Sequence, residues 1–285
     1  MKIGISFPES LKSPDYLFEW VRQVDAGPFS TLSILDRVVY SNYDPLITLA
    51  TAASISTRVR LMTEILLATI RNTTILAKEI ATLDVLSKGR LSLGLGVGAR
   101  EDDFLATETA YNHRGKRFEE QLRQMKHIWS GQALNDNVGP IGPRPRQANG
   151  PEILLGGFSP QAIQRVGHYA DGFISATNNV EQINQMFRTV EQSWQAAGRS
   201  GKPRLVAQID IALEAQNRGQ GRKNVVDYYT TMPQYLEYKL ATLLTTEQQL
   251  REIIPAVEQL GADELIFFVW SPEIDQIDRV AGLIR

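Results

Sequence analysis

Short apolar runs alternate with helical patterns along this 285-residue chain. Each apolar run has the length of a strand, and most are nearly continuous, as in parallel strands that are covered on both faces. The predicted strands are residues 2–7, 31–36, 59–67, 90–96, 152–156, 172–176, 204–213 and 264–269. The predicted helices are residues 15–25, 45–56, 75–86, 115–129, 160–169, 180–197, 246–260 and 274–283. Eight strand–helix units predict an α/β fold of the (β/α)8 TIM barrel type.

The chain length predicts one barrel domain over residues 1–285, because such a barrel needs about 250 residues. Two connections, after strands 4 and 7, are longer than simple loops and should form lids or interface elements. Residues 135–150 are rich in Pro, Gly and Asn. Residues 216–244 carry several tyrosines. We expect this second insertion either to close over the pocket as a mobile lid or to pack in a homodimer.

The amino-acid composition argues against several classes of protein function. Lys plus Arg number 30 and Asp plus Glu number 32, so no basic surface for nucleic acid or membrane is expected. No run of about 18 apolar residues is present to span a membrane. The absence of cysteine excludes disulfides and thiolate chemistry and fits a cytoplasmic enzyme. His113, His127 and His168 are not at metal-ligand spacing, so no metal site is expected.

Glycines end the predicted strand 90–96 in the pattern Gly94-x-Gly96-x-x-Ala99. The pattern has the form of a dinucleotide fingerprint, but that motif belongs in the first unit and needs an acidic residue at a later strand end. A plain tight turn is a second interpretation. We favour a third, in which a flat ring system approaches closely, because glycine has no Cβ to keep it away.

Two neighbouring strand ends carry small and polar residues suited to a phosphate. The runs are Gly156-Gly157-Phe158-Ser159-Pro160 and Ala176-Thr177-Asn178-Asn179. Ser159 could instead serve only as the N-cap of the next helix. Arg114, which starts the helix after the glycine strand, could bind a phosphate bidentately or belong to a solvated basic patch.

Glu64 interrupts an otherwise apolar predicted strand. A buried unpaired carboxylate is costly, so Glu64 should either form an ion pair with Arg37 or Arg71 or line a polar cavity. Of these we favour the ion pair. Asp36 and Arg37 follow the second strand at the same end of the barrel. Glu64 and Asp36 are therefore the candidate catalytic residues.

The chain resembles the bacterial luciferase-like monooxygenases, which are flavin- or deazaflavin-dependent barrel enzymes. The resemblance covers nearly the whole chain and is most specific at residues 77–90 (AKEIATLDVLSKGR) running into 93–98 (LGLGVG). Further agreement lies at Arg114 through Glu119-Glu120, at residues 154–159 with 170–172, and at residues 261–264. Two positions depart from the family pattern. Many relatives have Asp-His where this chain has Asp36-Arg37, and many have a small residue in place of Glu64.

The resemblance implies a reduced flavin across the carboxyl ends of the strands. Its phosphate would lie near Gly157, Ser159 and Thr177, with Arg114 as a cation. Its ring would lie near Ser6, Asp36, Thr63, Glu64 and Gly96. Gly156, Phe158 and Ala176 complete the expected cofactor-binding set. Family members often have a non-prolyl cis peptide in the third strand, which would fall at residues 63–65.

The implied activity is an FMN-linked monooxygenase that uses reduced flavin and O2 on a small organic substrate. Such an enzyme would depend on a separate flavin reductase and is expected to form homo-oligomers. Deazaflavin-dependent hydride transfer without oxygen is the first alternative. A non-enzymatic flavin-binding relative is the second. The cofactor supplies the chemistry in such enzymes, while the protein orients the ring and excludes water.

Overall fold

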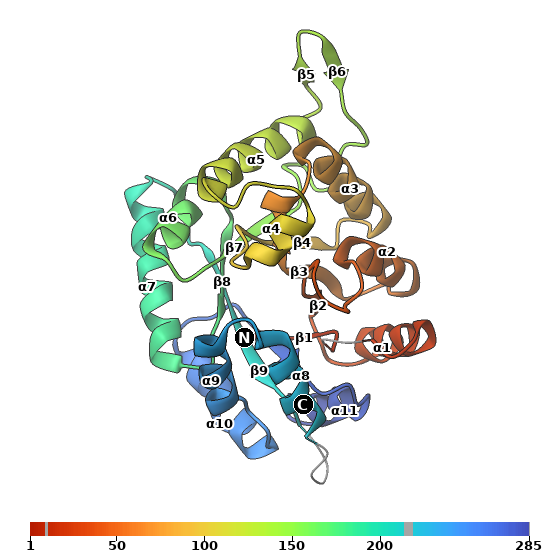
Figure 1. Cartoon of the computed structure of the whole chain (residues 1–285), viewed down its shortest axis with the longest axis vertical. Helices are drawn as coiled ribbons and strands as arrows, with labels where there is room; N and C mark the ends of the chain where they lie inside the picture. The colour runs from red at the N-terminus through yellow and green to blue at the C-terminus, as the bar shows by residue number, and fades with distance from the viewer. Residues whose placement is uncertain (9–10, 214–218, 285) are drawn as a thin grey trace.

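The barrel predicted from the sequence is present in the computed structural model, which describes residues 1–8, 11–213 and 219–284. Within these residues, eight parallel strands close in the order β1-β10-β9-β8-β7-β4-β3-β2 (Figure 1). They are β1 (Lys2–Ser6), β2 (Thr31–Ile34), β3 (Arg60–Leu67), β4 (Leu91–Gly96), β7 (Glu152–Gly156), β8 (Gly172–Ala176), β9 (Arg204–Ile211) and β10 (Glu264–Val269). Each lies within a stretch that the apolar pattern predicts as a strand.

Helices surround the barrel, and two of them begin at the capping residues that the sequence predicts. Asp44 and Ser159 accept backbone N–H groups at the starts of α2 and α6, and a proline follows each cap. The surrounding helices are α1 (Pro14–Ala26), α2 (Pro45–Ile55), α3 (Thr73–Leu86), α5 (Arg114–Trp129), α6 (Pro160–Tyr169), α7 (Val180–Ala196), α10 (Glu247–Gln259) and α11 (Asp275–Ala281). The 3-10 turn η1 (Ala68–Ile70) and the short helix α4 (Glu101–Ala106) were not predicted.

The core has two layers because successive strand residues point to opposite faces. One layer packs the strands against the helices. A separate cluster is formed by the alternate residues Met62, Leu154, Ile174, Val206 and Ile266, which come from different strands of the closed sheet. These side chains fill the barrel, so the space for a ligand lies beyond the strand ends. No helix in the described part of the chain is long and apolar enough to cross a membrane.

The insertion at residues 135–150 does not lie over the carboxyl ends of the strands. It belongs to a hairpin of β5 (Ala133–Asn135) and β6 (Val138–Pro140) that projects away from the barrel beside α5 and α3 (Figure 1). The reason is topological, since this segment joins the end of α5 to the start of β7. The expectation of a lid is therefore wrong for this insertion.

The second insertion does reach the carboxyl ends. It contains α8 (Gln220–Tyr229) and α9 (Pro233–Thr242), and its beginning at residues 216–218 lies outside the described residues. Leu244, after α9, forms a bridge with Ile211 at the end of β9. Buried contacts join both helices to Leu35, Phe268 and Trp270 at neighbouring strand ends. The insertion thus covers the carboxyl ends of the strands, which is the position that a lid over the pocket requires.

Candidate functional site

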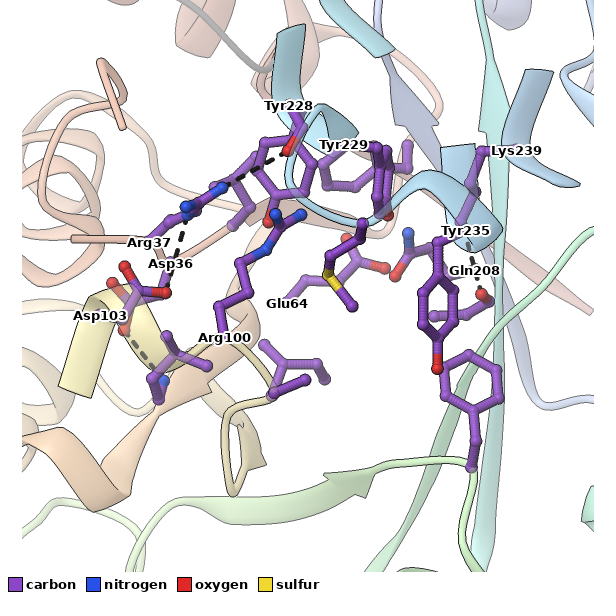
Figure 2. Close-up of a pocket in the computed structure, with 18 of the residues that line it drawn as sticks. Asp36, Arg37, Glu64, Arg100, Asp103, Gln208, Tyr228, Tyr229, Tyr235 and Lys239 are labelled. Carbon is purple, nitrogen blue, oxygen red and sulfur yellow. Dashed lines mark hydrogen bonds and ion pairs between the residues drawn. The ribbon is translucent and has the colours of Figure 1, made fainter. Parts of the chain in front are cut away.

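A cavity of about 260 Å³ lies where the strand ends meet α8 and α9 (Figure 2). Much of its wall is aromatic and comes from four separate segments. These side chains are Phe158, Tyr228, Tyr229, Tyr235, Phe268 and Trp270. Aromatic walls with a few polar groups are typical of sites for flat organic ligands.

Four of the residues predicted from the sequence line this cavity directly. They are Asp36, Glu64, Phe158 and Ala176. The other predicted residues do not form the cavity wall. Ser6, for example, is buried and accepts a hydrogen bond from the backbone N–H of Val269 (2.9 Å). Thr63 is also buried and donates to the carbonyl oxygen of Gly94 (2.9 Å).

Glu64 is buried on β3 and lines the cavity. Its Oε2 accepts a hydrogen bond from Ser33 Oγ, while its Oε1 has no hydrogen-bond partner. Burial raises the pKa of this carboxyl well above its ordinary value. The peptide bond from Glu64 to Ile65 is cis, at the place that the family resemblance implies.

The ion pair that we favoured for Glu64 is wrong, because both arginines have other partners. Arg71 Nη2 contacts Asp36 Oδ1 (3.1 Å) and Asp44 Oδ2 (3.2 Å). Arg37 pairs with Asp102 and Asp103. Glu64 instead lines a cavity, as in the alternative, but the surface of this cavity is mainly apolar and not polar. A buried carboxyl without a cation is more stable in its neutral form.

Asp36 is fixed in place by β3 and Arg71. Its Oδ2 accepts a hydrogen bond from the backbone N–H of Leu67 (2.9 Å), and both carboxyl oxygens contact Arg71 Nη2. Burial raises the pKa of Asp36, and the charge of Arg71 opposes that rise. The geometry makes Asp36 a residue that holds the end of β3 beside the cavity.

Arg37 explains one departure from the family pattern. Its guanidinium lies between Asp102 and Asp103 of α4 and the rings of Tyr40 and Tyr228. It therefore ties the end of β2 to both α4 and α8. A histidine at this position could not make the same set of charge-assisted and stacking contacts.

The glycines at the strand ends make room for Ile65. A Cβ on Gly96 would lie 2.8 Å from Ile65 Cγ2, and one on Gly156 would lie 2.9 Å from Ile65 Cδ1. A Cβ on Gly94 would lie 2.2 Å from the carbonyl oxygen of Thr63. These glycines thus have a packing reason that sequence reasoning missed, and the ring contact at Gly96 stays a prediction.

The two predicted phosphate loops differ in what their side chains already bind. Gly157 has a φ of +149°, and Ser159 accepts from the N–H of Ala162 (3.1 Å), which confirms its capping role. The hydroxyl of Thr177 donates to Gln182 Oε1 (2.7 Å) and contacts the hydroxyl of Tyr238 on α9. Helix α9 therefore sits on the second predicted phosphate contact.

Arg114 does not line the cavity. Its Nε donates to the carbonyl oxygen of Gly98 (3.0 Å), and its guanidinium stacks on Tyr111 at 3.7 Å from the ring centroid. It thus braces the connection between β4 and α5. Its predicted phosphate contact stays a prediction.

Sequence reasoning missed a polar cluster at the end of β9. Lys239 of α9 forms a buried ion pair with Asp210, and Trp270 Nε1 donates to Asp210 Oδ1 (3.0 Å). Burial alone would lower the pKa of Lys239, but Asp210 outweighs it and raises this pKa. The alternation of Gln208 and Asp210 in an apolar strand could have revealed the cluster, since both residues point to one face.

No three His, Asp or Glu side chains are grouped to hold a metal ion in the part of the chain that the structure describes. The titratable groups at the cavity are instead carboxyls, arginines, tyrosines and one lysine (Figure 2). They can hold, orient and protonate an organic ligand.

Comparison with known proteins agrees with this geometry. An uncharacterised protein of Mycobacterium tuberculosis is 30% identical over 186 residues, which are 63% of this chain and 65% of that protein. The FMNH2-dependent dimethylsulfone monooxygenase of Pseudomonas putida is 24% identical over 253 residues, covering 73% of this chain and 70% of the relative.

Two solved structures share the fold over almost the entire chain. Monooxygenase RslO1 from Streptomyces bottropensis has a TM-score of 0.82 at 22% identity, covering 100% of this chain and 97% of that one. An F420-dependent secondary alcohol dehydrogenase in complex with an F420–acetone adduct has a TM-score of 0.78 at 14% identity, covering 99% and 98%. Similar proteins therefore include users of FMN and of F420. The model of the luciferase-like monooxygenase family matches residues 1–256, so this chain belongs to that family of oxidoreductases.

Proposed function

We propose that this protein is an FMN-linked monooxygenase that uses reduced flavin and O2 on a small organic substrate. The aromatic cavity at the carboxyl ends of the strands carries the proposal, because it offers flat apolar walls with one neutral acid among them. The FMNH2-dependent relative and the likeness to RslO1 support the monooxygenase reading. A separate reductase as the source of reduced flavin is part of this proposal, as is a homo-oligomeric state.

The residues present fit a flavin. The aromatic wall and Ile65 suit the planar ring of a flavin. The residues proposed to lie around the edge of that ring are Ser6, Asp36, Thr63, Glu64 and Gly96. The phosphate would be held at the start of α6, where a Cβ on residue 157 would lie 2.6 Å from the Cβ of Ala162. Free N–H groups at a helix start attract an anion. Bound reduced flavin supplies the electrons that activate oxygen.

The chain's own contribution is orientation and exclusion of water. Tyr228, Tyr229 and Tyr235 of the insertion stand over the strand ends and replace solvent on that side of the cavity. Asp36 and Arg71 hold the end of β3 in place. Glu64 keeps a proton at the cavity wall. A dry site of this kind protects reactive oxygen chemistry from water.

F420-dependent hydride transfer is the second candidate. A protonated Glu64 favours it, because a neutral acid can stabilise an oxygen that gains electrons from a hydride donor. The F420-dependent neighbour of the same fold supports this alternative. It differs from the first candidate in cofactor and in its independence of oxygen.

The test is a set of flavin titrations followed by oxygen uptake. FMN, riboflavin, FAD and F420 are titrated into the purified protein, with tryptophan fluorescence as the readout. We expect FMN to bind at micromolar concentration or better and more tightly than riboflavin or FAD. Oxygen consumption with chemically reduced FMN is then compared with and without the protein. Preferred binding of F420, or equal affinity for riboflavin and FMN, would contradict the proposal.

A further inference from the structure

Glu64, which lines the cavity, has one polar atom without a hydrogen-bond partner. Its side chain lies on β3 with only 3% of the residue exposed, and Oε1 is the one fully buried carboxyl oxygen without a hydrogen-bond partner in the described ranges. The other carboxyl oxygen, Oε2, accepts a hydrogen bond from Ser33 Oγ. Leaving a buried polar atom unmatched is costly, so Oε1 calls for a partner that enters the cavity.

Burial is the main reason that the pKa of Glu64 is raised, and nearby charges modify this effect. Asp210 on β9 and Glu264 on β10 both act against its ionisation, and Lys239 on α9 acts the other way. The charge of Lys239 is already matched by its ion pair with Asp210. Because Oε2 accepts the hydrogen of Ser33, the acid proton belongs on Oε1. The cavity therefore contains a hydrogen-bond donor that is surrounded by aromatic rings.

We propose that Glu64 is a catalytic residue that donates a hydrogen bond from Oε1 to a carbonyl oxygen of the substrate. The substrate class that fits is a small aromatic or otherwise apolar ketone or aldehyde. The rings of Tyr229 and Trp270 would cover its apolar body, and Glu64 would polarise its carbonyl group without net proton transfer. This inference rests on the proposed function, because it places the substrate beside Glu64 in the same cavity as the flavin ring.

The protonation state is tested first, by infrared spectroscopy of the flavin-free protein at neutral pH. We expect a C=O stretching band of a protonated carboxylic acid that disappears in Glu64→Gln. The matched control is Glu120→Gln, which removes an exposed carboxyl and should leave the band unchanged. Absence of the band from the wild-type spectrum would mean an ionised Glu64 and would overturn the proposal.

Ligand binding is tested with acetophenone and ethylbenzene, which have similar shapes and differ in the carbonyl group. Saturation-transfer NMR of the flavin-free protein gives the affinity for each probe. We expect acetophenone to be preferred about two- to tenfold, the range of one hydrogen bond. Glu64→Leu should abolish this preference, and Glu64→Gln, which keeps an N–H donor, should retain part of it. Thermal melting verifies that each variant is folded.

The outcomes separate this inference from the proposed function. Equal binding of the two probes, or no binding of acetophenone, would overturn the carbonyl substrate class whether or not FMN binds. A further arm uses lumiflavin, the ring without its phosphate chain. If Glu64→Leu weakens lumiflavin and leaves the probe preference unchanged, Glu64 faces the flavin ring and the substrate role is overturned. Failure to bind FMN would instead contradict the proposed function alone.

Discussion

Lys239 of α9 and Asp210 of β9 form a buried ion pair that joins the insertion to the barrel. The same ammonium group donates to the carbonyl oxygen of Ala176 at the end of β8 (3.2 Å), and Asp210 also accepts from Trp270. The side chain of Asn178 donates to the carbonyl oxygens of Asp210 and Thr242. The position of the insertion over the cavity is thus set by buried and half-buried polar groups.

Lys239→Met should strongly destabilise the protein. It leaves Asp210 buried without its cation, and loss of one partner of such a pair typically costs about 3–5 kcal/mol. The double variant Lys239→Met with Asp210→Asn should recover most of that loss, because no uncompensated charge remains. Urea unfolding measures both changes. Lys116→Met, at an exposed i,i+4 pair with Glu120, is the control and should change little. A Lys239→Met protein as stable as wild type would show that α9 is held by other contacts.

Glu64→Gln should stabilise the protein increasingly as the pH rises. The folded state keeps the Glu64 proton above the ordinary pKa of 4.5, where the unfolded state releases it. The unfolded state then binds fewer protons, so the unfolding free energy falls with rising pH, by at most about 1.4 kcal/mol per unit from this one group. The glutamine variant lacks this slope.

Urea unfolding of both proteins between about pH 5 and 8 checks this linkage. The unfolding free energy of Glu64→Gln minus that of wild type should grow across this window. A constant difference would mean that Glu64 is ionised in the folded state throughout. A loss of several kcal/mol in Glu64→Gln at every pH would point back to the buried ion pair that the structure does not contain.

The barrel could be predicted because its determinants are local. The apolar run at residues 204–213 and the Ser159-Pro160 helix start both depend on neighbours in the sequence, and both appear in the structure as expected. The role of the segment that forms β5 and β6 was left open between a lid and an interface element, because composition reveals a long connection but not the end of the barrel on which it lies.

The site was only partly predictable, because its partners are distant in sequence. Glu64 was identified as an unusual residue within its strand, but its hydrogen-bond partner Ser33 is 31 positions away. Nothing in the local sequence indicated that Arg37 would form an ion pair with Asp102. Lys239 belongs to an insertion whose path over β9 is decided by tertiary packing. A pattern along the chain therefore identified the unusual residue, and the fold determined whether it is paired or exposed to the cavity.

Ser159→Ala should weaken FMN binding two- to tenfold and leave riboflavin binding unchanged, because the proposed phosphate contact is worth about one hydrogen bond. It should also cost about 1 kcal/mol of stability through the lost cap. Thr246→Ala removes the equivalent cap of α10 and is the matched control, with a similar stability loss and no effect on either flavin. Equal weakening of FMN and riboflavin would remove the phosphate from this loop.

Tyr238→Phe should strengthen FMN binding about two- to tenfold and leave riboflavin unaffected. The hydroxyl of Tyr238 contacts Thr177 Oγ1, so a phosphate at Thr177 must first displace a hydrogen bond of the closed insertion. Removing that hydroxyl takes away the contact from α9 without changing the size of the ring, and the hydrogen bond from Thr177 to Gln182 remains. Fluorescence titration with both flavins measures the effect, and Tyr169→Phe, which loses a hydroxyl contact with Arg123 at the far end of α6, is the control. Weaker FMN binding in Tyr238→Phe would instead mean that the tyrosine hydroxyl itself binds the phosphate, with α9 as part of the cofactor site.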